Sequence, residues 1–314
     1  MLSEIFDLSL FGATFRMVTP IFLAALGGTF CAQAGVFNIA LEGMMLVGAF
    51  AAVVGSHFSG SAWIGLLSAI AGGLIMALIF AGATLRMKAH PIVLGIALNM
   101  LAGASTTYLL TQIFHVTGAF RSPSLPSMPV IHLPVVQDIP VLGQILSGHS
   151  VIVYVSWGAA LLGSFLLYEQ VIGLRIRAVG QNPQAAGTLG VSVERTRFFA
   201  ILLCGVLAGM GGAQLSISNV RLFVQNMTAG RGFIALVAVL FGREKPLRVF
   251  GASMMFGFLD ALSVRIQGAS IAPQFVMMIP YVGTIAALFI LRDKQVPVLA
   301  KSDDSEEKGG RRSG

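Results

Sequence analysis

The sequence alternates between long apolar stretches and short polar connections. A helix needs about 20 apolar residues to cross the hydrocarbon core of a bilayer. Stretches of this kind occupy 9–30, 36–55, 62–83, 92–114, 150–168, 196–217, 229–242, 247–263 and 274–291. The pattern predicts an all-α, polytopic transmembrane helical bundle of about nine spans. The stretch 229–242 is short for a span, which indicates a broken or re-entrant element.

The polar connections divide the chain into a transmembrane domain, 1–300, and a charged, glycine-rich tail, 301–314, for which we expect a disordered cytoplasmic segment. Two connections are large. The loop 115–149 is rich in proline and nearly uncharged, so we expect short extended or helical pieces on the outer face. The loop 169–195 is polar and basic. Glu4 and Asp7 precede the first span where a signal peptide would carry positive charge, so we expect this span to be retained.

Basic residues mark one side of this arrangement. They gather after the third span, in the segment 169–197, in the loop 243–248 and in the tail: Arg86, Lys88, Arg175, Arg177, Arg195, Arg197, Arg243, Lys245, Arg248, Arg292, Lys294, Lys301, Lys308, Arg311 and Arg312. The other side holds Arg121, Arg221, Arg231 and Arg265, and Arg16 falls inside the first stretch. Because cytoplasmic loops carry the excess of Lys and Arg, the N-terminus is predicted outside and the C-terminus in the cytoplasm.

Composition supports a multi-pass protein of the inner or plasma membrane. Hydrophobic residues make up 56% of the chain and charged residues 11%, against about 25% charged residues in soluble domains. Membrane lipids must therefore solvate much of the surface. The net charge is +7, and the basic residues cluster in particular loops, which indicates topology and not a nucleic-acid surface. Cys31 and Cys204 lie in apolar stretches and predict neither a disulfide nor a metal site.

No pattern in the chain predicts catalysis. There is no Gly-Lys dipeptide, so a phosphate-binding loop is excluded, and there is neither an HExxH nor a CxxC motif. The five histidines are scattered over loops and helix ends. We therefore expect no enzyme activity, no cofactor and no metal in this chain.

Asn38 and Glu42 are the most notable polar pair. They lie one turn apart at the start of a helix that is otherwise apolar through Val54. A carboxylate inside a bilayer costs several kcal/mol unless it is paired or faces a polar cavity. Two interpretations stay open: Glu42 lines the transport pathway or stabilises a broken helix, or it caps the N-terminus of a neighbouring helix or bonds loop amides. In both, it faces protein and not lipid.

Three other spans carry isolated polar residues: Asn99, Gln214 and Asp260. For each one, a hydrogen bond between helices is the simpler explanation. Together they suggest a polar seam suited to a neutral, hydroxylated solute. The run Gly205 to Gly212 places small residues four apart, which permits close helix packing but indicates no particular function.

The segment between Gly173 and Gly190 predicts a short helix outside the membrane. Asn182 is a good N-cap, Pro183 suits the first helical position, and Gly190 can end the helix in a left-handed conformation. The helix is expected over 183–189. A short, rigid, exposed helix is suited to docking in a partner's groove, and an ordinary structured loop is the alternative.

Three blocks of sequence resemble a known family. They are Gly35-Val-Phe-Asn38-Ile-Ala-Leu-Glu42-Gly43-Met44-Met45, Ala178-Val-Gly180-Gln-Asn182-Pro183-Gln-Ala185-Ala186 and Gly230-Arg231-Gly232-Phe233-Ile-Ala235-Leu-Val-Ala238-Val-Leu-Phe241-Gly242. They resemble the permeases of ABC importers of the ribose and branched-chain amino acid type. Within that family the chain is similar to the nucleoside branch, which works with Bmp-type binding lipoproteins. The resemblance covers nearly the whole chain.

The resemblance implies a permease subunit for nucleoside uptake in a four-part transporter. A second permease chain, paralogous or identical, would complete the pathway. A separate ATPase subunit would drive it, and an extracytoplasmic substrate-binding lipoprotein would deliver the solute. The segment 183–189 would be the coupling helix, with Asn182, Pro183, Gln184, Ala185 and Ala186 at the ATPase. The alternatives are a simple-sugar, ribose-like ABC permease and a secondary transporter, although ion-coupled carriers usually bury more charged groups than Glu42 and Asp260.

Overall fold

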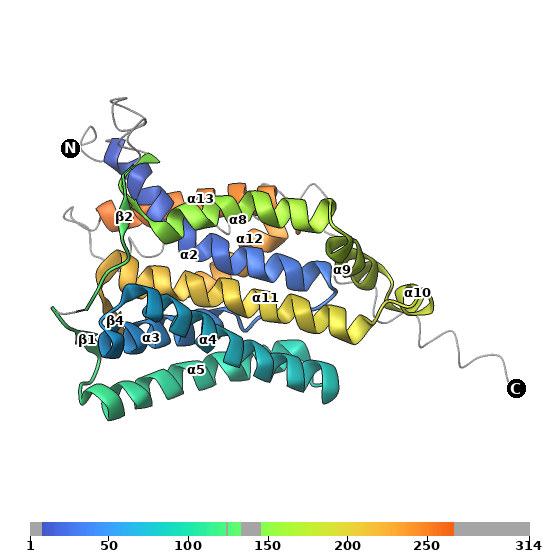
Figure 1. Ribbon diagram of the computed structural model, residues 1–314, viewed down its shortest axis with the longest axis horizontal. Helices are drawn as coiled ribbons and strands as arrows, with labels where there is room; N and C mark the ends of the chain where they lie inside the picture. The colour runs from blue at the N-terminus through green and yellow to red at the C-terminus, as the bar shows by residue number, and fades with distance from the viewer. Residues whose placement is uncertain (1–7, 124, 133–145, 267–314) are drawn as a thin grey trace, which may run out of the picture.

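The computed structural model describes residues 8–123, 125–132 and 146–266, and these form an elongated, mostly helical bundle (Figure 1). The helices are α2 (Leu8–Gln33), α3 (Leu41–Ser59), α4 (Ala62–Ala81), α5 (Pro91–Phe114), α8 (Val151–Tyr168), α9 (Val171–Gln181), α10 (Pro183–Thr188), α11 (Val193–Ala213), α12 (Arg231–Phe241) and α13 (Pro246–Ile266). A π-helical segment prolongs α4 at Gly82–Arg86 and another prolongs α11 at Gln214–Val220.

Within the described residues, seven helices are long and apolar enough to cross a membrane: α2, α3, α4, α5, α8, α11 and α13, with the π-helical extensions included. The predicted stretch 229–242 contains α12, which has only 11 residues and falls short of a span. The predicted ninth span, 274–291, and the tail, 301–314, lie outside the described residues. The span count and the orientation of the termini therefore stay predictions.

Two short sheets modify the all-α prediction. β1 (Ala119–Arg121) pairs antiparallel with β4 (Leu222–Val224), and β2 (Val130–Ile131) pairs antiparallel with β3 (His149–Ser150). Three of these strands belong to the predicted loop 115–149 or its border, whose part 133–145 is outside the described residues. The pairing of β1 with β4 joins this loop to the segment that follows α11. The fold is mostly helical, with strands at one end only (Figure 1).

The core is built around α2, α3 and α11. In the spans of these helices 67–72% of the residues are buried, against 22% in α5 and 33% in α8 and α13. Glycines permit the close approach of α11 to α3 and α4: a methyl group at Gly209 would collide with the Ala69 carbonyl, and Gly48 faces the Gly209 backbone. The outer helices instead expose large apolar side chains, such as Leu161 (68%) and Met100 (71%), as lipid-facing surfaces do.

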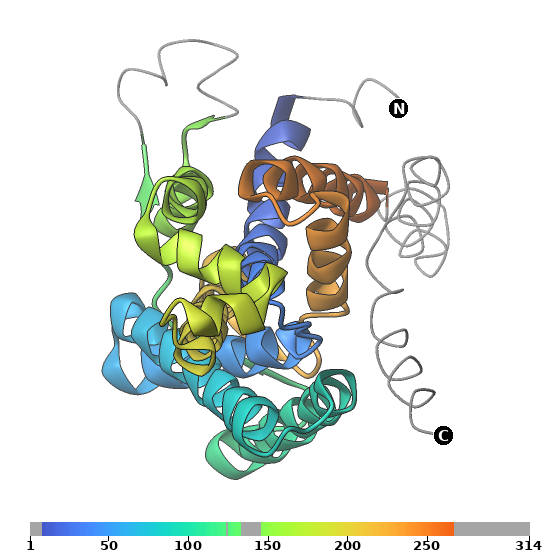
Figure 2. The ribbon, with the colours of Figure 1, turned by 90° about the vertical axis from the view of Figure 1, so that its right-hand side faces the viewer.

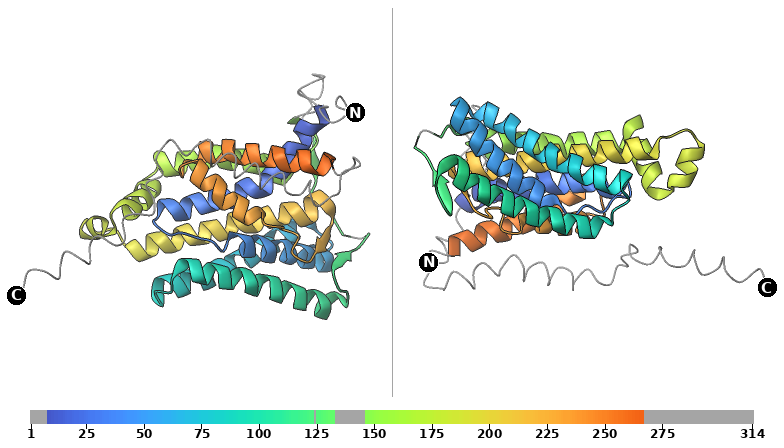
Figure 3. Two further views of the ribbon diagram at one scale, coloured as in Figure 1. Left: turned by 180° about the vertical axis from the view of Figure 1, so that it is seen from behind. Right: turned by 90° about the horizontal axis from the view of Figure 1, so that it is seen from below.

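The basic connections meet at one end of the bundle. The Gln33 amide at the end of α2 donates to the carbonyl of Glu244 (2.9 Å), which places the α12–α13 connection beside the α2–α3 connection. The Arg197 guanidinium donates to the carbonyl of Ala34 (3.2 Å), and Arg86 and Arg195 line one groove. α9 and α10 project from this end, opposite β1 and β4 (Figures 1 and 3).

The segment predicted as the loop 169–195 is largely helical. α9 covers 11 residues of it and α10 six. α11 begins at Val193, three residues before the predicted start of the span at 196, so Arg195 and Arg197 lie on its first turns. The apolar stretch begins only at 196 because the charged first turns contain no apolar run, whereas Ser192 as the N-cap, with Glu194 in the first turn, predicts the start that the structure shows.

Candidate functional site

The connection between α2 and α3 holds Asn38 inside the protein. Asn38 is 2% exposed. Its Oδ1 accepts a hydrogen bond from the backbone N–H of Ala40 (2.9 Å), two residues further on, and its Nδ2 lies 3.4 Å from the Cys204 sulfur. The side chain therefore shapes the turn that begins α3. Its amide donors face the sulfur atoms of buried cysteines and of Met44.

Asn99 holds the start of α3 from a neighbouring helix. It is the ninth residue of α5. Its Oδ1 accepts from the backbone N–H of Gly43 (2.8 Å), and its Nδ2 donates to the carbonyl of Ile39 (3.0 Å). The residue at the N-cap of α3, Ala40, has no side-chain acceptor. Asn99 thus supplies from α5 the capping bond that α3 cannot make for itself.

Glu42 caps the start of α12 from the neighbouring helix α3. Its Oε1 accepts from the N–H of Gly230 (2.8 Å) and its Oε2 from the N–H of Gly232 (2.6 Å), and the residue is 7% exposed. Gly230, the N-cap of α12, has φ +82° and no side chain, so the carboxylate of α3 caps this helix instead. A Cβ on Gly232 would meet the Glu42 backbone, so only glycine fits there. Of the two interpretations of Glu42, this geometry corresponds to the second, in which the carboxylate caps the N-terminus of a neighbouring helix.

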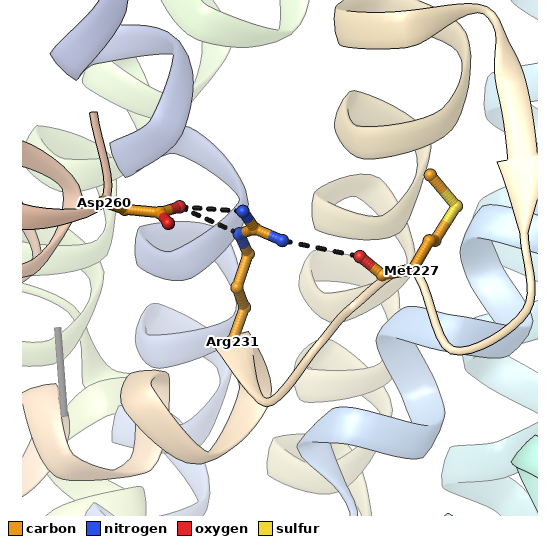
Figure 4. Close-up of polar contacts among 3 residues, drawn as sticks. All are labelled: Met227, Arg231 and Asp260. Atoms are coloured by element: carbon orange, nitrogen blue, oxygen red, sulfur yellow. Dashed lines mark hydrogen bonds and ion pairs between the residues drawn. The ribbon is translucent and has the colours of Figure 1, made fainter. Parts of the chain in front are cut away.

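Arg231 and Asp260 form an ion pair beside that cap (Figure 4). The Arg231 Nη2 and Nε donate to Asp260 Oδ2 at 2.8 and 3.1 Å, and Nη1 donates to the carbonyl of Met227 (3.4 Å). The two side chains are 18% and 15% exposed. From its sequence position, Arg231 resembles a loop charge, so it was not among the predicted site residues. The signal that could have found it is an opposite charge in another apolar segment, since buried charges need partners.

These contacts join into one polar belt through the middle of the bundle. The belt runs from Asn99 on α5, through the start of α3 with Glu42, to the start of α12 with Arg231, and ends at Asp260, the fifteenth residue of α13. Gln214 is not part of it. Its side chain bonds Ser150 (2.9 Å) and Asn219 (3.0 Å) at the end where the strands lie. Of the three residues predicted to form a polar seam, Asn99 and Asp260 therefore lie in the belt, and Gln214 lies apart from it.

The segment 182–190 adopts the local structure that the sequence predicts. α10 spans Pro183–Thr188, one residue shorter than expected. The Asn182 Oδ1 accepts from the N–H of Ala185 (3.0 Å), and Gly190 has φ +80°. Gln184 and Ala185 are exposed, whereas Ala186 is buried and anchors α10 to the rest of the protein. Figure 2, in which this end of the molecule faces the viewer, shows α9 and α10 standing in front of the bundle.

The described ranges contain no group of His, Cys, Asp and Glu side chains arranged to hold a metal ion. Cys31 and Cys204 are both buried, unpaired thiols. The contacts observed in the belt are hydrogen bonds and one ion pair.

Comparison with known proteins gives a consistent result. Residues 10–288 match the family described as the permease component of branched-chain amino acid transport systems. The chain is 36% identical to the guanosine ABC transporter permease protein NupQ of Bacillus subtilis, covering 88% of this chain and 89% of NupQ. It is 35% identical to the nucleoside ABC transporter permease protein NupC of Lactococcus lactis, covering 88% of this chain and 90% of NupC.

The protein named putative glucose ABC transporter permease protein TsgC13, of Haloferax volcanii, is 32% identical, covering 90% of this chain and 91% of TsgC13. A second guanosine permease of Bacillus subtilis, NupP, is 28% identical, covering 82% of this chain and 74% of NupP. Among solved structures, an ABC transporter in an inward-facing conformation superposes with a TM-score of 0.54 at 16% identity, covering 90% of this chain and 84% of that chain. This likeness concerns the fold alone.

Proposed function

We propose that this chain, which belongs to the permease family of branched-chain amino acid transport systems, carries nucleosides into the cell. As a member of that family, it is a multi-pass transport subunit of the plasma membrane and not an enzyme. The observation that carries this proposal is the similarity to two nucleoside permeases, 36% and 35% identical over nearly the whole chain. A simple sugar is the second candidate, favoured by the 32% identity to TsgC13. The neutral character of both solutes suits a belt in which Arg231 pairs with Asp260 and Glu42 accepts from backbone N–H groups.

The proposal includes three partners. A second permease chain completes the pathway, and the similarity of the chain to both guanosine permeases of Bacillus subtilis, NupQ and NupP, supports a paralogous pair. A separate ATPase supplies the energy, since this chain has no phosphate-binding loop. An extracytoplasmic binding lipoprotein delivers the solute.

We place nine spans in the membrane, with the N-terminus outside and the C-terminus in the cytoplasm. This count includes the stretch 229–242, with α12, as a broken span. The end that holds Arg86, Arg175, Arg195 and Arg243 is then cytoplasmic, because Lys and Arg concentrate in cytoplasmic loops. This orientation puts α10 at the ATPase as the coupling helix. Gln184 and Ala185 form its exposed edge, while Asn182, Pro183 and Ala186 fix its shape and position.

The pathway lies, in this proposal, beside α12. Irregular backbone at membrane depth is tolerated only where it is buried in protein or lines a water-filled cavity. The segment 225–230 is irregular and leads to the polar belt, so it should be covered by protein or line a cavity. In the single chain, however, Asn226 is exposed and Phe233 on α12 is 45% exposed. The second permease chain would cover this face, with the solute passing between the two chains. Glu42 and Asn99 then act by holding the helix starts that shape the pathway.

Solute uptake tests the assignment. Cells that carry the gene and its neighbouring transport genes are compared with an isogenic deletion strain for uptake of labelled guanosine, uridine, ribose and glucose. We expect the deletion to abolish high-affinity nucleoside uptake and the restored gene to recover it. Unchanged nucleoside uptake together with lost sugar uptake would establish the sugar permease instead.

A further inference from the structure

A groove opens between α9 and the start of α11. It has a volume of about 460 Å³, and its walls include Arg175 and Ile172 from α9, Arg195 and Phe199 from α11, and Leu189 and Ser192 from the link between α10 and α11. No acidic side chain lines it. Neither arginine has an ion-pair or hydrogen-bond partner among residues 8–123, 125–132 and 146–266. The groove therefore offers two unpaired cations beside apolar walls.

The groove lies where the membrane surface is expected. The guanidinium of Arg177 stacks over the ring of Tyr168 at 4.9 Å, at the end of α8. Tyrosine is enriched at the boundary between hydrocarbon and headgroups, and arginine also acts as an anchor there. α9 follows with Val171 (63% exposed) and Leu174 (59% exposed) among its arginines, a composition typical of a helix that lies in the interface.

An apolar strip leads from the groove along α11. Phe199 is 43% exposed, and Leu203, Val206 and Met210 follow on the same face with partly exposed side chains. This strip runs from the basic end toward the middle of the transmembrane helix. The groove and the strip thus form one surface, cationic at the interface and apolar toward the bilayer centre.

We propose that this surface binds an anionic phospholipid. The phosphate group lies between Arg175 and Arg195, within reach of the Ser192 hydroxyl, and an acyl chain follows Phe199 toward Met210. Basic pockets between helices at the cytoplasmic surface are suited to such headgroups. An acidic side chain of the ATPase would satisfy the arginines but would leave the apolar strip unexplained. A neighbouring groove shares Ser192 and Arg195 but is lined by Glu194 as well as Arg86, which makes it less suited to an anion.

Lipid binding to the complete purified chain in detergent tests this proposal. Native mass spectrometry and thermal unfolding measure the affinities for phosphatidylglycerol and for phosphatidylcholine with the same acyl chains. We expect phosphatidylglycerol to bind more tightly and to raise the unfolding temperature. The double variant Arg175→Gln with Arg195→Gln should bind it about thirtyfold more weakly, the factor that corresponds to about 1 kcal/mol for each arginine. The single variant Arg195→Gln should bind it about fivefold more weakly.

The matched control is Arg243→Gln with Lys245→Gln, which removes two exposed charges from the same end but outside the groove. Its phosphatidylglycerol affinity should equal that of the wild type. An equal loss in this control would mean a diffuse attraction to the surface and would overturn the proposal. Glycerol 3-phosphate, which has the phosphate but no chain, should not stabilise the protein; equal stabilisation would point to a free-anion site instead. A groove variant that keeps its lipid affinity but no longer co-purifies with the ATPase would assign the groove to that partner.

Discussion

Glu42 and Asn99 share one physical task, although they lie on different helices. Each provides hydrogen-bond acceptors for the backbone N–H groups at the start of a helix to which it does not belong. α3 and α12 both begin without a side-chain cap of their own. In a membrane protein no water is available to satisfy such groups, so a buried side chain must do it.

This role leads to a graded prediction for Glu42. Glu42→Ala removes both acceptors and should lower the stability by about 1–3 kcal/mol for each buried N–H left without a partner. Glu42→Gln keeps one acceptor oxygen, but its amide nitrogen faces a backbone donor, so its stability should be intermediate. Thermal unfolding in detergent, together with solute uptake, measures both. An alanine variant with wild-type stability and uptake would remove Glu42 from the functional residues.

The Arg231–Asp260 pair predicts a double-mutant cycle. Asp260→Leu leaves a mostly buried guanidinium without its counter-charge, and Arg231→Met leaves the carboxylate unpaired; breaking a buried pair in either way costs about 3–5 kcal/mol. The double variant Arg231→Met with Asp260→Leu removes both charges and should recover most of the stability. Denaturation of the four proteins gives the coupling energy. If the single and double variants are equally unstable, the pair acts by shape and not by charge.

The polar residues of the belt could be found from the sequence, but their partners could not. Glu42, Asn99 and Asp260 in the belt, and Asn38 in the turn before α3, stand out because each interrupts an apolar run. The groups that Glu42 bonds lie 188 and 190 residues further along the chain, and they are backbone N–H groups of glycines, which carry no polar side chain. Arg231 was missed because its position at a helix start resembles a loop charge.

At the scale of the elements, the hydrophobic pattern predicted the long helices and the short stretch 229–242 that contains α12, but it missed α9 and the strands. The spans could be predicted because about 20 apolar residues are a strong signal. α9 was missed because its 11 residues mix apolar and basic side chains. β1 and β4 have three residues each, too few to show alternation, and their pairing joins segments about 100 residues apart. α10 could be predicted because capping residues mark both of its ends.

The glycines between α11, α3 and α4 predict a position-dependent effect of the same substitution. Gly209→Ala places a methyl group against the Ala69 backbone and should destabilise the protein by about 1–3 kcal/mol. Gly158 on α8 is the matched control, because nothing lies within 4 Å of its added Cβ. Gly158→Ala should be neutral or stabilising by up to about 1 kcal/mol, since alanine is the better helix former. Equal unfolding temperatures for the two variants would contradict the tight packing of α11.

At the scale of the whole molecule, the orientation in the membrane can be tested with single cysteines. The native Cys31 and Cys204 are fully buried, so they should contribute little background. Gln184→Cys in α10 should react with a membrane-impermeant maleimide only in inverted vesicles, and Thr117→Cys, at the opposite end beside β1, only in intact cells. Both residues are exposed. The reverse labelling pattern would mean that the protein has the opposite orientation in the membrane.

In the proposed transporter, α10 is the coupling helix that contacts the ATPase. Ala185 is exposed on the outer edge of this helix, while the buried Ala186 and the Asn182 cap hold it in place. Ala185→Glu should bury an unpaired carboxylate against the ATPase and cost several kcal/mol of docking, while the chain still inserts and folds. Arg243→Glu is the control, since it places a carboxylate in the α12–α13 connection at the same end. Co-purification with the ATPase and solute uptake should both fail in Ala185→Glu and persist in Arg243→Glu. The opposite outcome would move the ATPase contact to residues 243–248.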